Sequence, residues 1–148
     1  MNNKIPPPFV TLICIIIIYF SKSFFNEIFS YNNTIISISL LVIGFTVLFS
    51  AVKSFHNQKT TINPLKPHKA SSLVISGIFK YSRNPMYLGM LLILLSISFK
   101  FNLIGGVTVS IFFYLFITKF QIIPEEKAMK KLFEDKFISY SKNTRRWI

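Results

Sequence analysis

The sequence predicts an all-α integral membrane protein with four transmembrane helices, a tight C-terminal helical hairpin and a cytoplasmic amphipathic C-terminal helix. Three observations predict this class. Hydrophobic residues make up 51% of the 148-residue chain, and its mean hydropathy of +0.51 is too high for an ordinary soluble domain of this length. The apolar residues gather in four runs. The 17 lysines and arginines, against 5 acidic residues, are distributed very unevenly around these runs.

Four apolar runs are candidates for membrane spans, which need about 20 residues. We place them at about residues 8–25, 35–52, 85–101 and 103–123. The second and fourth runs are long enough to cross a bilayer, and the third is slightly short. The first run also has the character of a signal-peptide core, but no small-residue cleavage site follows Phe20. We therefore interpret the first run as a retained transmembrane helix.

The basic residues predict the orientation of these helices. Fifteen of the 17 lysines and arginines fall before the first run, in the loop over residues 53–84, or in the end of the fourth run and the tail over residues 124–148. Cytoplasmic segments of membrane proteins are enriched in lysine and arginine. We therefore expect both termini and the central loop in the cytoplasm. The chain is predicted to be a single domain over residues 1–148 in a bacterial inner membrane.

The same distribution accounts for the net charge of +12. On a soluble chain this excess suggests nucleic acid as a partner, but here the orientation rule explains it, so we expect the lipid bilayer and no nucleic acid. The single cysteine, Cys14, lies inside an apolar run and cannot form an intramolecular disulfide. One thiol and two distant histidines make no metal site, so we expect no metal.

The third and fourth runs are predicted to form a tight antiparallel hairpin. The stretch "FKFNLIGG" turns within a few residues around Asn102, and the two glycines that follow allow close helix approach. The hairpin returns the start of the third helix, with Arg83 and Asn84, to the same membrane face as the end of the fourth. Glu125 and Glu126 follow that end. Residues far apart in the sequence thus become neighbours.

Each of these residues also has a purely structural interpretation. Asn84 before Pro85 is a good helix N-cap followed by a favoured first-turn proline. Arg83 alone fits an interfacial anchor. Glu125 and Glu126 fit a helix N-terminus, where carboxylates meet the positive end of the helix dipole. The tail "PEEKAMKKLFEDKFISYSKNTRRW" spaces apolar residues at helical intervals with lysines between them. That pattern is typical of a basic amphipathic helix on a membrane surface.

Taken together, the motifs resemble a known family. The stretch "SSLVISGIFKYSRNPMYLG", the short hairpin and the tail "PEEKAMKKLFEDKFISYSKNTRRW" resemble the isoprenylcysteine carboxyl methyltransferase family, which is related to the phospholipid N-methyltransferases. The family pattern is Arg-His-Pro-x-Tyr-x-Gly at the opening of a membrane helix. A Glu-Glu pair follows the hairpin, and then a Phe and a Tyr about seven residues apart. The resemblance covers roughly residues 63–147.

The resemblance implies a membrane-embedded enzyme that transfers a methyl group from S-adenosyl-L-methionine, with the cofactor at the cytoplasmic end of the hairpin. It implies catalytic roles for Arg83 and Glu125. The residues that it implies in cofactor binding are Arg83, Asn84, Pro85, Tyr87, Gly89, Glu125 and Glu126. Four further residues match supporting positions of the family, namely Gly77, Asn102, Phe133 and Tyr140.

Three positions depart from the family pattern. Ser72 stands where the eukaryotic carboxyl methyltransferases have a histidine. The aromatic residue after Gly77 is Phe79, which lacks a hydroxyl, and the motif histidine is Asn84. Asparagine can hydrogen-bond, but it carries no charge near neutral pH. These departures weigh against a prenylcysteine substrate more than against the cofactor.

The residue types fit methyl transfer. A methyl sulfonium is already activated, so the reaction mainly needs donor and acceptor to be held in line. Arg83 can bind the cofactor's carboxylate through two parallel hydrogen bonds, and a glutamate can receive its ammonium or its ribose hydroxyls. Gly89 leaves room for a bulky group against the backbone. Tyr87 either orders the cofactor or belongs to the interfacial aromatic belt. No residue is an obvious general base, which favours a small or lipophilic acceptor with a carboxylate, a thiolate or a readily deprotonated amine.

Two other function classes fit parts of the sequence. Sterol reductases are similar in their C-terminal hairpin, so a membrane reductase that uses a nicotinamide cofactor is one alternative. No separate nicotinamide motif accompanies the hairpin, which argues against it. The other alternative is a non-enzymatic helical membrane protein. The joint presence of Arg83, Asn84, Glu125 and Glu126 argues against that reading.

Overall fold

The computed structural model describes residues 5–24, 32–58 and 72–148. All regular structure in these ranges is helical, which confirms the predicted all-α class for them. The main helices are α1 (Pro7–Ser21), α2 (Asn32–Asn57), α3 (Pro85–Phe101), α4 (Leu103–Ile117) and α5 (Ile123–Asn143), with short helical turns at η1 (Lys22–Phe24), η3 (Gly77–Lys80) and η4 (Thr118–Ile122). The end of the first predicted span at residue 25 lies outside the described residues. So do Lys4 and three lysines of the predicted loop, Lys59, Lys66 and Lys69.

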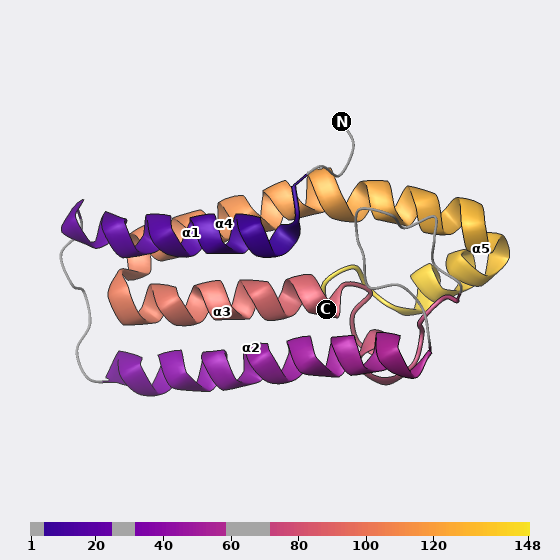
Figure 1. Ribbon diagram of the computed structural model, residues 1–148, viewed down its shortest axis with the longest axis horizontal. Coiled ribbons are helices and arrows are strands. Elements are labelled where there is room, and N and C mark those ends of the chain that lie inside the picture. Colours follow the sequence, from indigo (N-terminus) through magenta and orange to yellow (C-terminus); the bar gives the residue numbers. More distant parts are fainter. Residues whose placement is uncertain (1–4, 25–31, 59–71) are drawn as a thin grey trace.

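Successive apolar helices run in opposite directions, with α3 in the middle (Figure 1). α2 packs along α3 in the most extensive helix contact of the structure, while α1 packs on both α3 and α4 (Figure 1). The apolar centre where α1, α3 and α4 meet includes Ile18, Leu94, Phe113 and Ile117, all fully buried. This arrangement places the start of α3 and the end of α4 at the same end of the bundle.

Three helical segments are long and apolar enough, by length and composition, to cross a membrane. They are Pro7–Phe24, Asn33–Asn57 and a window within Leu103–Asn143. α3 is also apolar but has only 17 residues. The predicted count of four spans therefore stays a prediction, although α3 lies alongside the longer helices over its whole length (Figure 1).

Asn102 alone connects α3 to α4. Its side-chain Oδ1 accepts a hydrogen bond from the Gly105 backbone nitrogen at 3.1 Å, which caps the start of α4. Its Nδ2 donates to Ser21 Oγ at the end of α1, also at 3.1 Å. Gly106 lies so close to Ser98 of α3 that a Cβ there would overlap the serine side chain. The connection is therefore as tight as the sequence predicts.

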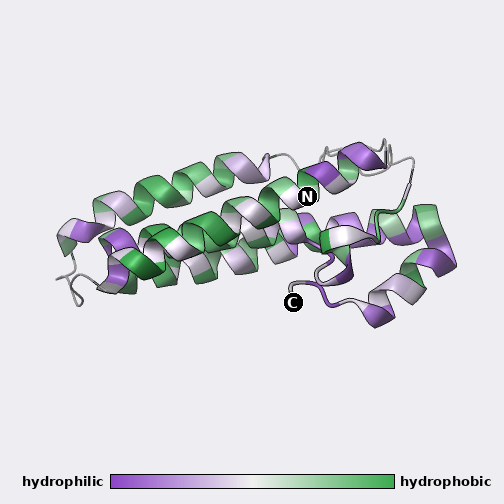
Figure 2. Ribbon diagram, turned by 90° about the horizontal axis from the view of Figure 1, so that it is seen from below, coloured by the Kyte–Doolittle hydropathy of each residue, from purple (hydrophilic) through white to green (hydrophobic). Residues whose placement is uncertain are grey.

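The fourth helix does not end at residue 123, where the fourth predicted span ends. α4 continues through the π-helical turn η4 into α5, which extends beyond the bundle and then turns back (Figure 1). The turn falls at Glu134, whose φ of 40° interrupts the helix. α5 and the neighbouring connections are largely hydrophilic, whereas the bundle is largely hydrophobic (Figure 2). The predicted tail helix is thus bent, and its position on a membrane surface stays a prediction.

Candidate functional site

The start of α3 and the start of α5 face each other at one end of the bundle. Arg83 Nη2 lies 3.0 Å from Glu126 Oε1, and the two side chains are only 13% and 18% exposed. These residues are 43 positions apart in the sequence, so their contact depends on the α3–α4 hairpin. The two sides of the predicted site are therefore in direct contact.

A second arginine, which the sequence analysis did not single out, binds the same glutamate. Arg146 donates from Nε to Glu126 Oε1 at 3.0 Å and from Nη2 to Oε2 at 2.7 Å. This two-point geometry is the strongest that arginine forms with a carboxylate. The hydrogen bond to Glu126 raises the pKa of Arg146. The only sequence signal for Arg146 was its place in the basic tail, which the membrane rule already explained.

Glu125 has a different partner. Tyr87 of α3 donates a hydrogen bond from its hydroxyl to Glu125 Oε1 at 2.5 Å. Glu125 lies just beyond the predicted fourth span, and burial raises the pKa of its carboxyl to about 8, with the charge of Glu126 adding to the rise. Glu125 therefore holds a proton at neutral pH far more readily than an exposed glutamate.

Consecutive helix positions point about 100° apart, yet both glutamates find partners. Glu125 faces Tyr87 on α3, whereas Glu126 faces the two arginines. The π-helical turn Thr118–Ile122 directly precedes them. A π-turn inserts a residue into the helical register and so rotates everything that follows it. This local change of register sets which face of α5 carries the pair.

Asn84 occupies the N-cap position of α3, but its side chain makes no capping hydrogen bond. Its Nδ2 donates instead to the Arg146 carbonyl oxygen at 2.8 Å. Pro85 fills the first helical position and is fully buried. The helix start predicted here is present, and the asparagine also links it to the end of the chain. A cofactor contact of either residue stays a prediction.

Gly89 is buried against α2. A Cβ on Gly89 would lie 2.8 Å from the Gly44 carbonyl oxygen, and one on Gly44 would lie 3.0 Å from the Gly89 carbonyl oxygen. The absence of a side chain at Gly89 thus lets α2 and α3 approach closely. The backbone of α2 fills the space beside the Gly89 Cα on this side, and a contact of Gly89 with the cofactor stays a prediction.

The last residues of the chain form a non-helical segment that we call the C-terminal strap (residues 144–147). Its backbone is tied to the start of α3, since Arg83 N donates to the Arg145 carbonyl oxygen at 3.0 Å. At its end, Trp147 Nε1 donates to Thr118 Oγ1 at 3.1 Å, and its ring packs on Tyr114 with centroids 4.8 Å apart. The strap therefore runs from the start of α3 to the end of α4, and on the way its Arg146 side chain contacts Glu126.

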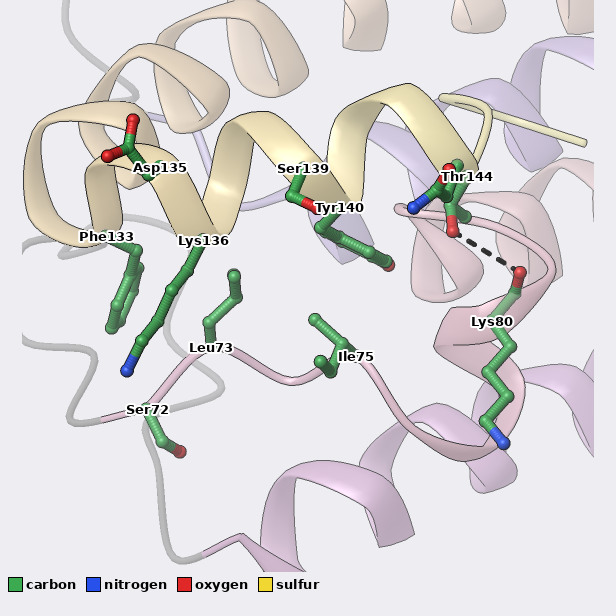
Figure 3. Close-up of a pocket in the computed structure, with 11 residues that line it drawn as sticks. Ser72, Leu73, Ile75, Lys80, Phe133, Asp135, Lys136, Ser139, Tyr140 and Thr144 are labelled. Atoms are coloured by element: carbon green, nitrogen blue, oxygen red, sulfur yellow. Dashed lines mark hydrogen bonds between the residues drawn. The ribbon is translucent and has the colours of Figure 1, made fainter.

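A cleft of about 1050 Å³ opens beside these residues, between the segment before α3 and the second half of α5. The residues that line it are Ser72, Leu73, Ile75, Lys80, Phe133, Asp135, Lys136, Ser139, Tyr140, Asn143 and Thr144. In Figure 3, Tyr140 and Lys136 extend from α5 toward the segment that carries Leu73 and Ile75, whereas the Asp135 carboxylate points away. The cleft combines apolar walls with basic and hydroxyl groups.

The cleft shares a wall with the arginine site. Tyr140 lines the cleft and donates from its hydroxyl to the Phe79 carbonyl oxygen at 2.6 Å. Burial raises the pKa of this phenol, and the positive charge of Arg83 opposes the rise. Thr144 also lines the cleft and is the first residue of the strap. Gly77 supports this wall with a φ of 62°, which glycine adopts at low cost.

Two buried polar atoms have no hydrogen-bond partner among the described residues, namely Arg83 Nε and Gln121 Oε1. Leaving a buried donor or acceptor unpaired costs about 1–3 kcal/mol. The unpaired Nε belongs to the arginine that the sequence singles out for anion binding. Within the described part of the chain, no group of three histidine, cysteine or acidic side chains is arranged to hold a metal.

Comparison with protein families finds a match to the family model described as phospholipid methyltransferase, over residues 32–136. The matched range includes both glutamates and every predicted residue of the α3 motif, whereas the C-terminal strap lies beyond it. Neither the curated proteins nor the solved structures gave a match.

Proposed function

Because the chain belongs to the phospholipid methyltransferase family, we propose that it is a membrane-embedded methyltransferase that uses S-adenosyl-L-methionine. The family includes the isoprenylcysteine carboxyl methyltransferases, so the resemblance seen in the sequence is confirmed. The proposed acceptor is a small or lipophilic molecule with a carboxylate, thiol or amine. The observation that carries the proposal is the meeting of Arg83, Glu126, Tyr87 and Glu125 beside an open cleft.

Arg83 is the proposed site for the cofactor's carboxylate. Its Nη2 already binds Glu126, but its buried Nε has no partner among the described residues. A carboxylate would complete the hydrogen bonding of this guanidinium with a charge-assisted contact. Burial of the site strengthens such a contact, because it is less screened by water.

Glu125 is the proposed partner for the ammonium or the ribose hydroxyls. It lies beside Arg83's partner Glu126 but is not itself paired with an arginine in the structure. Tyr87 fixes one of its oxygens through the 2.5 Å hydrogen bond. With a pKa of about 8, Glu125 holds a proton at neutral pH when the site is empty, and the positive charge of a bound ammonium would favour its ionised form.

The remaining predicted residues have supporting roles in this proposal. Asn84 and Pro85 set the start of α3, and Gly89 holds it against α2. We place the adenosine part of the cofactor in the neighbouring cleft, where Phe133 and Tyr140 offer aromatic contacts. Ligand sites commonly have volumes of about 300–1,000 Å³, and the cleft, at about 1050 Å³, lies just above the upper end of that range.

When bound, the cofactor would supply an activated methyl group, whose bond to sulfur would break as the acceptor heteroatom takes the methyl, and a neutral thioether would leave. The chain's own contribution is positional. Arg83 and Glu125 orient the charged end, and the apolar helices exclude water from the adjoining membrane face. Preorganised positioning of this kind supplies most of the acceleration in displacement reactions that need no covalent help from the protein.

The apolar helices and the family support an integral membrane protein. We propose four spans, with both termini in the cytoplasm. The placement of both termini on one side is supported by the bond from Gln121 Nε2 to the Ile5 carbonyl oxygen at 2.7 Å, and the distribution of basic residues favours the cytoplasm as that side. That bond places the start of α1 at the same end of the bundle as α5 and the strap.

Binding of S-adenosylhomocysteine to the purified protein tests the proposal. We expect radiolabelled S-adenosylmethionine to bind and to be displaced by S-adenosylhomocysteine but not by NADPH. Displacement by NADPH alone would favour the reductase alternative, and binding of neither ligand would contradict an enzyme of either kind. Untargeted detection of methylated products in membranes with and without the protein then identifies the acceptor.

A further inference from the structure

We infer that Arg146 is a positioning residue of the proposed cofactor site, which neutralises Glu126 so that Arg83 keeps its positive charge for the ligand. This inference rests on the proposed function, because it assigns the ligand's carboxylate to Arg83. It extends the site to the C-terminal strap, which lies beyond the residues matched by the family model.

The first step is the arrangement of charges. Glu126 lies between two guanidinium groups, and Arg146 takes it in a two-point contact at 3.0 and 2.7 Å. Arg83 reaches only Glu126 Oε1, from Nη2, at 3.0 Å. The three side chains together carry one net positive charge. That charge is the complement of a single carboxylate.

The second step concerns the hydrogen-bond donor of Arg83 that has no partner. Its Nε is buried and has no hydrogen-bond partner among the described residues. Without Arg146, the Glu126 carboxylate would be free to rotate onto Arg83 and form the two-point contact with it. The pair would then be neutral as a whole, and fewer of Arg83's five N–H donors would remain for the ligand. Arg146 prevents this by occupying Glu126.

The third step is that the strap is held in place independently of this ion pair. Asn84 Nδ2 donates to the Arg146 carbonyl oxygen at 2.8 Å, and Arg83 N donates to the Arg145 carbonyl oxygen at 3.0 Å. Trp147 anchors the far end on Thr118 and Tyr114. The position of the Arg146 guanidinium beside Glu126 is therefore set by contacts that do not involve the Arg146 side chain. Removing that side chain leaves those contacts in place.

The experiment compares two ligands that differ only at the charged end. S-adenosylhomocysteine carries the carboxylate, whereas 5′-methylthioadenosine has the thioether and the adenosine but no amino-acid end. We expect Arg146→Ala to weaken S-adenosylhomocysteine binding by about ten-fold or more and to leave 5′-methylthioadenosine binding within about two-fold. Lys142→Ala, which removes an exposed cation of α5 just before the strap, is the matched control and should leave both affinities unchanged.

A suppressor variant tests the mechanism. If Arg146 acts by neutralising Glu126, then Glu126→Gln added to Arg146→Ala should restore part of the lost affinity, because the net charge of the site returns to +1. Arg146→Lys should lie between wild type and Arg146→Ala, since it keeps the charge but not the two-point geometry. Trp147 is the single tryptophan of the chain, so its emission reports whether the strap stays docked in each variant.

The outcomes separate the two proposals. Equal weakening of both ligands in Arg146→Ala, or wild-type affinity for S-adenosylhomocysteine, overturns the positioning role while leaving the cofactor proposal intact. Failure of Glu126→Gln to restore affinity overturns the neutralisation mechanism. A wild-type protein that binds neither ligand overturns the proposed function and this inference with it. If Arg146→Ala does not fold, Arg146→Lys decides, and wild-type affinity in that variant counts against the inference.

Discussion

The Tyr87 hydroxyl donates to Glu125 Oε1 at 2.5 Å and so joins the start of α3 to the start of α5. Tyr87 is 6% exposed, and this bond crosses the hairpin at the point where the proposed site opens. The carboxyl of Glu125 is held at a pKa of about 8 by burial, against an ordinary value of 4.5, even though the hydrogen bond from Tyr87 works in the opposite direction. The contact between α3 and α5 through Tyr87 and Glu125 therefore depends on pH.

Stability should fall as the pH rises from about 4.5 through about 8. Between these values the folded protein holds a proton on Glu125 that the unfolded chain releases, so the unfolded state is favoured as protons become scarce. Below pH 4.5 the contribution is constant, and above pH 8 the loss is complete. Thermal unfolding of the detergent-solubilised protein between pH 4 and pH 9 measures this trend. Glu125→Gln should flatten it, and an unchanged slope in that variant would contradict the assignment.

Arg83→Ala should weaken cofactor binding by about 30-fold or more while leaving expression nearly intact. The change removes the proposed carboxylate ligand and one partner of a mostly buried ion pair. Loss of such a partner reduces the free energy of binding by about 2–5 kcal/mol. Because Arg146 still neutralises the charge of Glu126, we expect a loss of binding free energy toward the lower end of this range. Affinity for S-adenosylhomocysteine measures the effect. Lys53→Ala, which removes an exposed basic residue of α2, is the control for loss of charge alone. Wild-type affinity in Arg83→Ala would return Arg83 to the role of an interfacial anchor.

Much of this site could be predicted from the sequence because its parts lie on regular elements. The hairpin follows from two apolar runs separated by one asparagine, and it brings Arg83 to the glutamates without further assumptions. The role of the strap could not be predicted, because no periodicity marks residues 144–147 and the excess of basic residues already had an explanation. The π-turn before Glu125 also leaves no clear sequence signal. It decides which glutamate faces which partner, a question that helical spacing alone left open.

Arg83 and Glu126 should be energetically coupled more strongly than Arg83 and Glu125. Neighbouring charges in one network typically show coupling of about 0.5–3 kcal/mol, whereas independent sites add. From the sequence, Glu125 is the favoured glutamate for the direct cofactor contact opposite Arg83, with Glu126 as the alternative. The structure gives the 3.0 Å contact to Glu126. Double-mutant cycles on S-adenosylhomocysteine affinity, with alanine at Arg83 and at each glutamate in turn, measure both couplings. Equal couplings would indicate that the bound ligand, not the direct ion pair, links the groups.

Residues at the two ends of α2 should be accessible from opposite sides of the membrane. Within α2 (Asn32–Asn57), Asn33 lies near the α3–α4 turn and Lys53 lies toward the other end, which is the end of the proposed site. The distribution of basic residues predicts that this second end is cytoplasmic. In a Cys14→Ala background, single cysteines at Asn33 and Lys53 should react with an impermeant thiol reagent from the outer and inner sides respectively. Labelling of both from one side would contradict the predicted crossing of α2.

Gly89→Ala should destabilise the protein by separating α2 from α3. The added Cβ would lie 2.8 Å from the Gly44 carbonyl oxygen, which is backbone and cannot rotate away. Overpacking of this kind costs about 1–3 kcal/mol. We expect a lower unfolding temperature in detergent, and Gly44→Ala should have a similar effect because the contact is reciprocal. The comparison of the two variants also separates packing from ligand binding. Gly44 lies outside the predicted cofactor set, so similar losses of stability with similar ligand affinity in both variants assign Gly89 to the helix contact. A loss of S-adenosylhomocysteine affinity in Gly89→Ala alone would restore the direct ligand role that the sequence predicts.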